Sequence, residues 1–290
     1  MSNSEAILDV ENLSVSFGGI KALEGVNLSV KADTITALIG PNGAGKTTVF
    51  NCLTGFYKAS GGNIYFNGKK GRVRINTILG EAFHVSDFWT PSSLFKRLFF
   101  KMFGGSHLVA RNGVARTFQN IRLFKDMTVI ENLLVAQHEK VSKNLISGIL
   151  QTKNFAAKER KAVETCYHWL KVVGIEDYDN RLAGELPYGV QRRLEIARAL
   201  CIDPKIICLD EPAAGLNPQE TADLSDLILR LRNDFGFTIF VIEHDMSMVM
   251  KISDEIFVLD HGVVISSGKP EEIKKDPRVL EAYLGNDEDS

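Results

Sequence analysis

The stretch "GPNGAGKTT", residues 40–48, matches the pattern G-x-x-x-x-G-K-[ST] and decides the fold of this 290-residue chain. It follows the apolar run "TITALIG" (34–40), which is typical of a buried strand, and it leads into the helix-like run "GKTTVFNCLTGF" (45–56). Glycines at 43 and 45 let successive N–H groups point inward, and the positive end of the helix adds to the attraction for an anion. In this strand–loop–helix context the pattern predicts a loop that binds a triphosphate. A plain glycine turn is the alternative.

The residues expected to line the triphosphate are Gly40, Pro41, Asn42, Gly43, Ala44, Gly45, Lys46, Thr47 and Thr48. We expect Lys46 to reach the β- and γ-phosphates as a point charge. We expect the Thr47 hydroxyl to coordinate Mg²⁺.

A second motif, "IICLDEP" (206–212), places two carboxylates after an apolar strand. Asp210 is expected to hold the magnesium ion from a neighbouring strand end, and Glu211 to orient or deprotonate the attacking water. A capping turn is the alternative for this acidic pair. His244 ends another buried strand, "FTIFVIEH" (237–244), from which it could touch the γ-phosphate or serve a purely structural role.

Composition excludes several classes of protein. The chain is 44% hydrophobic and 24% charged, as ordinary soluble globular proteins are, and its net charge of −2 argues against a nucleic-acid partner. The four cysteines form no CxxC pair, so we expect buried thiols of a cytosolic protein rather than disulfides or a zinc site. No export signal is visible, and no apolar stretch approaches the roughly 18 residues of a spanning helix.

Strand-like and helix-like patterns alternate along the chain, which predicts an α/β fold with a mostly parallel sheet. Residues 128–174 are helical in pattern, so a helical subdomain of about residues 120–200 is expected to be inserted. The run 255–268 predicts a hairpin, and 270–285 predicts one short helix.

A segment from about 70 to 112 does not fit this order. Residues 69–112 contain eight lysines and arginines against two acidic residues. Within the segment, one face of an expected helix is apolar, formed by Leu94, Phe95, Leu98, Phe99, Met102 and Phe103. Such a helix suits a membrane surface or a partner protein, and a small satellite core is the alternative.

A further stretch, "ELPYGVQRRLEIARAL" (185–200), opens a helix with a loop that could hold an anion. Gly189 stands near its start, with Pro187 and Tyr188 beside it. The N–H groups around Gly189 and the helix dipole offer an anion site. An ordinary amphipathic helix is the alternative. Its apolar stripe consists of Val190, Leu194, Ala197 and Cys201.

Taken in order, "GPNGAGKTT", "LPYGVQRRLEIARAL", "IICLDEP" and "VIEHD" make the chain resemble an ATP-binding cassette (ABC) ATPase over nearly its whole length, except about 70–112. Within that family, the chain is similar in pattern to the LivG type of branched-chain amino acid importer ATPases. The stretches that carry this similarity are "FGGIKAL", "GVARTFQNIRLFKDMTVIENLL" and "VLEAYLG". The resemblance implies a single ABC domain over residues 1–290. It also implies a P-loop NTPase fold with a RecA-like core, an antiparallel β subdomain and a helical subdomain. The implied activity is hydrolysis of ATP with Mg²⁺.

The same resemblance implies roles for single residues. Phe17 is expected to stack on adenine, where the family usually has tyrosine. Gln119, in "RTFQN", is expected to sense Mg²⁺ and the γ-phosphate near the contact with the membrane subunits. Asn217, in "AAGLN", takes a place that many members fill with aspartate, so no acid role is expected there.

Residues 186–190 depart from the family signature Leu-Ser-Gly-Gly-Gln, whose serine and glycine meet the γ-phosphate bound by the other subunit. Pro187 lacks both a hydroxyl and an N–H, while Tyr188 and Val190 replace a glycine and a glutamine. We therefore expect Tyr188 and Gly189 to form a working but weakened clamp.

The resemblance also implies partners and a location. The expected partners are a second ATPase subunit, two membrane permease subunits and, indirectly, a periplasmic binding protein, at the cytoplasmic face of the inner membrane. The rival hypothesis is a soluble ABC ATPase that acts as a clamp or assembly factor without transport. A simple P-loop kinase would not explain "LPYGVQ" or His244.

Overall fold

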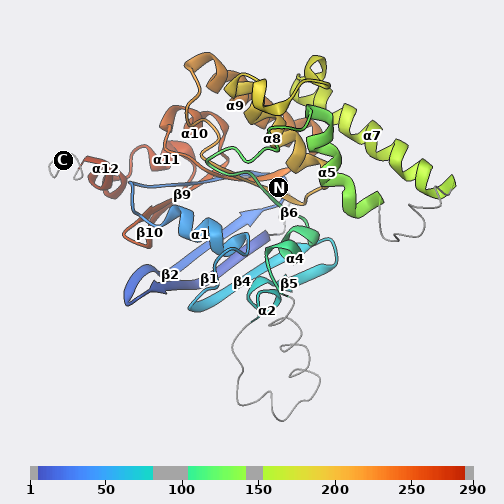
Figure 1. Ribbon diagram of the computed structural model, residues 1–290. Coiled ribbons are helices and arrows are strands. Elements are labelled where there is room, and N and C mark those ends of the chain that lie inside the picture. Colours follow the sequence, from blue (N-terminus) through green and yellow to red (C-terminus); the bar gives the residue numbers. More distant parts are fainter. Residues whose placement is uncertain (1–5, 81–103, 142–152, 285–290) are drawn as a thin grey trace, which may run out of the picture. The chain divides into compact units, whose positions relative to one another are not determined.

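In the computed structural model, the residues described are 6–80, 104–141 and 153–284. They are shown as ribbons in Figure 1. The expected apolar helix face between Leu94 and Phe103 lies outside the described residues. Within the described ranges, no helix is both long enough and apolar enough to cross a membrane.

The chain divides into two compact units. The first unit comprises Met1–Arg116, Lys205–Glu211 and Ile228–Ser290, and the second comprises Thr117–Pro204 and Pro212–Leu227.

Two sheets make up the first unit (Figure 1). One is antiparallel in the order β2-β1-β4-β5, with strands Ala6–Phe17 (β1), Ile20–Lys31 (β2), Gly61–Gly68 (β4) and Gly71–Arg74 (β5). The other has the order β10-β9-β3-β8-β7-β6. Its strands are Ile35–Ile39 (β3), Val114–Arg116 (β6), Ile206–Asp210 (β7), Thr238–Ile242 (β8), Glu255–Asp260 (β9) and Val263–Gly268 (β10).

Every pairing in the six-stranded sheet is parallel except the β9–β10 hairpin, which confirms the expected α/β fold with a mostly parallel sheet. Strands β3, β7 and β8 are buried at all of their positions. Their apolar runs lack the alternation of a half-exposed strand because both faces of such a sheet are covered.

Helix α1 (Lys46–Leu53) continues from β3 and packs its apolar side chains into the core of this unit. The Phe50 ring stacks on Phe240 of β8 with 5.8 Å between centroids. This packing fixes α1 against the parallel sheet.

Within the part of the first unit that the structure describes, the other helices confined to it are short. They are Ile75–Ile78 (α2), Ser106–Arg111 (α4), Met246–Ile252 (α10), Pro270–Ile273 (α11) and Pro277–Leu284 (α12). The prediction of one helix over 270–285 was wrong, because the chain breaks into α11 and α12. The Asp276 carboxylate accepts a hydrogen bond from the Arg278 N–H, and Pro277 suits the first turn of a new helix.

The second unit is helical. Its main elements are Val129–Val141 (α5), Lys153–Val173 (α7) and Tyr188–Cys201 (α8), with short 3₁₀ turns at Glu176–Tyr178 and Ala183–Glu185. Helix α9 (Pro218–Phe235) begins in this unit. Cys166, Leu170 and Val173 of α7 are buried. The four cysteines, at 52, 166, 201 and 208, are all buried, and none of them forms a disulfide.

Candidate nucleotide-binding site

The loop after β3 needs glycine at Gly40 for steric reasons. Gly40 has φ 149°, and a Cβ there would lie 1.9 Å from the Leu259 carbonyl oxygen on the neighbouring strand β9. Gly45, the N-cap of α1, has φ 102°, and its Cβ would lie 2.8 Å from a Leu23 methyl group. No L side chain fits either position without strain. These two glycines therefore allow the loop to lie close against strands β9 and β2.

Lys46 is the first residue of α1, and its side chain folds back over the loop. The residue is 7% exposed, and its ammonium donates to the Gly40 carbonyl at 2.7 Å and to the Pro41 carbonyl at 2.9 Å. Burial lowers the pKa of Lys46, and the negative charge of Glu211 opposes that effect. A triphosphate entering the loop would add negative charge beside this ammonium and favour its charged form.

Asp210, Glu211 and His244 come from the carboxyl ends of two adjacent parallel strands. Asp210 pairs with Ile242 in the β7–β8 ladder, and the Glu211 N–H donates to the Ile242 carbonyl at 2.9 Å. Strand β8 also pairs in parallel with β3, which leads into the phosphate loop. Both predicted motifs therefore lie at the carboxyl ends of parallel strands, which is where open α/β sheets bind their ligands.

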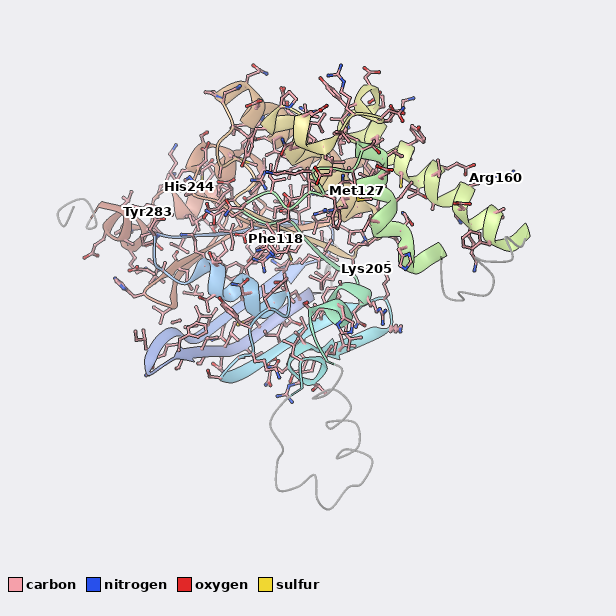
Figure 2. All side chains as sticks on the ribbon, in the orientation of Figure 1. Phe118, Met127, Arg160, Lys205, His244 and Tyr283 are labelled. Atoms are coloured by element: carbon pink, nitrogen blue, oxygen red, sulfur yellow. The ribbon has the colours of Figure 1, made fainter. Side chains whose placement is uncertain are left out.

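Glu211 is held in an unusual backbone conformation. Its φ is 45°, a region that residues other than glycine seldom adopt. Such strain concentrates at functional sites, where the surrounding structure fixes a side chain in one direction. His244, labelled in Figure 2 just before α10, lies with Nδ1 3.8 Å from a Glu211 carboxylate oxygen. The two side chains predicted to act on the γ-phosphate and the attacking water therefore lie together.

The predicted magnesium ligands are the Thr47 hydroxyl, the Gln119 side chain and a single carboxylate, Asp210. Among the described residues, no group of three or more histidine, cysteine and acidic side chains could hold a metal ion. Magnesium is commonly bound by one or two protein oxygens together with the phosphates of a nucleotide, so this sparse donor set fits that ion.

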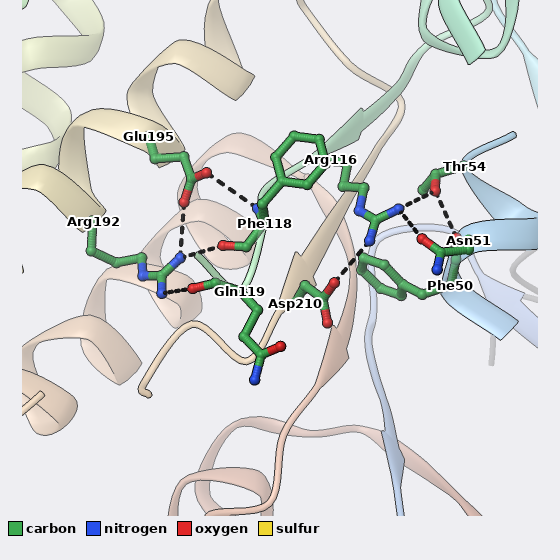
Figure 3. A network of polar contacts seen from close by, with 9 residues as sticks. All are labelled: Phe50, Asn51, Thr54, Arg116, Phe118, Gln119, Arg192, Glu195 and Asp210. Carbon is green, nitrogen blue, oxygen red and sulfur yellow. Dashed lines mark hydrogen bonds and ion pairs between the residues drawn. The ribbon is translucent and has the colours of Figure 1, made fainter. Parts of the chain in front are cut away.

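Arg116, at the end of β6, was not singled out from the sequence. Its guanidinium donates to the Asp210 carboxylate at 2.9 Å and, from the other terminal nitrogen, to the side-chain oxygens of Asn51 at 2.7 Å and Thr54 at 2.9 Å (Figure 3). The Arg116 side chain is 10% exposed and that of Asp210 only 4%. One side chain thus ties α1 to the carboxylate expected to hold magnesium.

Phe17, the predicted adenine-stacking residue, ends β1 with 47% of its surface exposed. The edge of its ring meets Tyr57 with 5.3 Å between centroids. This edge contact orients the Phe17 ring while leaving much of it accessible to a base.

The second unit carries Tyr188 and Gly189 in the first turn of α8. Pro187 is the N-cap with an extended backbone, and its carbonyl accepts from the N–H groups of Val190 and Gln191, both at 3.0 Å. A Cβ on Gly189 would lie 2.7 Å from a Glu220 carboxylate oxygen. The Tyr188 ring is 42% exposed, and its hydroxyl lies 3.3 Å from an Arg192 nitrogen.

Arg192 joins α8 to the segment that carries Gln119. Its side chain and that of Glu195 are each 1% exposed and are paired at 2.9 Å. The guanidinium also donates to the carbonyls of Phe118 at 2.8 Å and Gln119 at 2.9 Å, while Glu195 accepts from the Phe118 N–H at 3.2 Å. Figure 3 shows the Gln119 side chain extending away from this cluster. The buried pair therefore fixes the backbone of Phe118 and Gln119.

Asn217 has a structural task at the start of α9. Its side-chain oxygen accepts from the Glu220 N–H at 2.9 Å, and the Glu220 carboxylate accepts from the Asn217 N–H at 3.0 Å. This reciprocal pair is a capping box.

Comparison with known proteins identifies the class. A family model described as "ABC transporter" matches residues 23–214, and one described as "Branched-chain amino acid ATP-binding cassette transporter" matches residues 263–289. The first match spans the phosphate loop, α8 and the Asp210–Glu211 pair. The chain belongs to the ABC transporter family.

Two individual proteins show which kind of ABC transporter subunit the chain is similar to in sequence. The chain is 48% identical over 282 residues to the high-affinity branched-chain amino acid transport ATP-binding protein BraF of Pseudomonas aeruginosa, covering 97% of this chain and 99% of that protein. It is 46% identical, with the same coverage, to the protein of the same description named LivG in Escherichia coli. These similarities confirm the predicted resemblance.

Solved structures agree with this assignment. A crystal structure of an ATP-binding cassette of an ABC transporter in its ADP conformation superimposes with a TM-score of 0.72 at 32% identity, covering 97% of this chain and 99% of that chain. A nucleotide-free cassette from an ABC transporter gives a TM-score of 0.71 at 33% identity, with 96% and 99% coverage. The chain therefore has the ABC ATPase fold.

Proposed function

We propose that this chain is the ATP-hydrolysing subunit of a bacterial ABC importer for branched-chain amino acids. It would work at the cytoplasmic face of the inner membrane with a second ATPase subunit and two permease subunits, supplied indirectly by a periplasmic binding protein. The whole chain, residues 1–290, would act as one ABC domain whose helical subdomain spans about 120–200.

One observation carries the proposal furthest. Lys46 lies over the phosphate loop, and Asp210, Glu211 and His244 end strands of the same parallel sheet. A cation for phosphates, a carboxylate for a metal and a second carboxylate for a water proton are the parts that hydrolysis of a phosphoanhydride requires. The 48% identity to BraF over 97% of the chain supports branched-chain amino acids as the cargo.

The residues divide the chemistry between them. Lys46 and the N–H groups of the loop would bind the β- and γ-phosphates, and Thr47 and Asp210 would hold Mg²⁺, which neutralises charge between those phosphates. Glu211 would accept a proton from the attacking water, while His244 and Gln119 would contact the γ-phosphate. Phe17 would hold the adenine.

The start of α8 supplies the second half of the proposed cycle. Tyr188 and Gly189 would cover the γ-phosphate held by the partner ATPase, so ATP would favour the closed pair and hydrolysis would release it. A soluble assembly or clamp ATPase is not favoured. The chain matches its relatives over nearly their whole length, and these relatives are described as transport ATP-binding proteins.

The experiment is transport by the purified complex in proteoliposomes, with ATP inside and with the periplasmic binding protein and radiolabelled branched-chain amino acids, leucine first, outside. The native complex should hydrolyse ATP and take up leucine. Glu211→Gln should bind ATP with unchanged affinity and lose about 100-fold or more of the hydrolysis rate, because a general base contributes about that much. Unchanged hydrolysis would exclude Glu211 as the base, and hydrolysis without uptake of any branched-chain amino acid would remove the importer assignment.

A further inference from the structure

The contacts of Arg116 indicate a role in the metal site that neither motif contains. The guanidinium contacts three side-chain oxygens from two elements, namely Asn51 and Thr54 near the end of α1 and Asp210 at the end of β7. It also lies over two aromatic rings, 5.0 Å from the Phe50 centroid and 4.9 Å from that of Phe56. All of these residues belong to one unit of the chain.

This environment fixes the guanidinium in position and orientation. The two aromatic rings contact the flat face of the guanidinium and restrain its tilt. The hydrogen bonds involve the N–H groups at its rim and restrain its rotation within the plane. Phe50 is fully buried and stacked on Phe240, which makes one wall rigid. Arginine is the side chain suited to such a place, since lysine has no planar fork.

The restrained guanidinium in turn restrains Asp210. At 3% exposure, this carboxylate has lost most of its solvent, and an uncompensated charge there would be costly. Arg116 compensates the charge and holds Oδ2 at 2.9 Å. A carboxylate has about four lone-pair directions on its two oxygens, so a bond to Arg116 is compatible with a metal ligand.

We propose that Arg116 is a positioning residue for magnesium, which orients the Asp210 carboxylate towards the ion that accompanies the nucleotide. The inference rests on the proposed function. Side chains that orient a metal ligand commonly change metal affinity by about 10- to 100-fold when they are replaced. Arg116 also ends β6, and Gln119, another predicted magnesium ligand, follows it three residues later in the sequence.

The test measures metal binding apart from turnover. In the full-length chain carrying Glu211→Gln, a fluorescent ATP analogue is bound first with EDTA and then at increasing Mg²⁺, and Mn²⁺ binding is followed by electron paramagnetic resonance. Arg116→Gln should leave affinity in EDTA within about 2-fold and raise the half-saturating Mg²⁺ and Mn²⁺ concentrations about 10-fold or more. Arg116→Lys, which keeps the charge, should give a smaller shift.

Thr54→Val is the matched control, because it removes one acceptor of Arg116 without touching Asp210. It should leave metal affinity nearly unchanged. If Arg116→Gln does not fold, Arg116→Lys decides the question on the same measurements. Unchanged metal affinity, or an equal loss of affinity with and without metal, would refute the positioning role. Failure of the parent chain to bind the nucleotide at all would instead refute the proposed function.

Discussion

The phosphate loop and the start of α8 are both openings of helices that are expected to meet phosphate, yet they are built differently. The phosphate loop is shaped by its own backbone, with positive φ at Gly40, Gly43 and Gly45. The start of α8 has an extended N-cap, Pro187. The buried side chain of Arg192, in the same helix, binds Glu195 and the carbonyls of Phe118 and Gln119. The first site therefore depends on local residue types, and the second on side chains that come together only in the folded chain.

The largest effect is expected in the phosphate loop. Lys46→Ala removes the buried ammonium, so ATP affinity should fall about 100-fold or more, as the loss of charged hydrogen bonds to two phosphates would cause. Isothermal titration calorimetry checks this, with the exposed Lys70→Ala as the control. Equal ATP affinity in the two variants would mean that the loop does not bind phosphate as proposed.

The next effect concerns the support of α8. Arg192→Met leaves Glu195 buried without its partner, which should lower the free energy of unfolding by about 3–5 kcal/mol. Arg193→Met is the control, because the Arg193 pair with Asp223 is longer, at 3.7 Å, and partly exposed, and such pairs contribute about 1 kcal/mol or less. Chemical denaturation measures both. The double change Arg192→Met with Glu195→Leu should recover part of the loss, and similar losses in both single variants would contradict the distinction.

The smallest effect is expected at Gly189, and Gly40 serves as its comparison. A Cβ at Gly40 meets a backbone oxygen at 1.9 Å, while a Cβ at Gly189 meets the end of the Glu220 side chain at 2.7 Å. Gly40→Ala should therefore abolish nucleotide binding. Gly189→Ala should leave ATP binding to the single chain within about 2-fold and should weaken ATP-dependent pairing by about 10-fold, roughly the effect of 1.4 kcal/mol.

Relief of that contact provides the control. Combining Gly189→Ala with Glu220→Ala removes the crowded carboxylate and should restore much of the pairing, at a cost of about 1 kcal/mol from the lost capping box. Gel filtration with and without ATP measures the pairing. If Gly189→Ala already pairs as the parent does, the start of α8 is not the clamp.

Features that depend on contiguous residues could be predicted from the sequence, whereas features that depend on tertiary packing could not. The strands β3, β7 and β8 and the loop between β3 and α1 follow from contiguous residues: apolar runs, glycines and the lysine. The capping box of Asn217 and Glu220 is also local. Strand β5 was missed because its four residues are exposed or half-buried and carry two arginines, which no strand pattern distinguishes from a loop.

The two arginine clusters could not be predicted from spacing. Arg116 lies 65 residues from Asn51 and 94 from Asp210 in the sequence, and Arg192 lies 74 from Phe118. The spacing of Arg192 and Glu195 predicts only an ordinary surface pair on a helix. Their burial depends on how α8 packs, so tertiary structure decides their roles.

The most direct test of the account is the nucleotide dependence of pairing between Glu211→Gln and the second ATPase of its transporter, followed by analytical ultracentrifugation. The account predicts a stable pair with Mg²⁺ and ATP, little pairing with ADP, and none when Lys46→Ala is added. Pairing that is the same with ATP, with ADP and without nucleotide would contradict it, as would the absence of any pair with ATP.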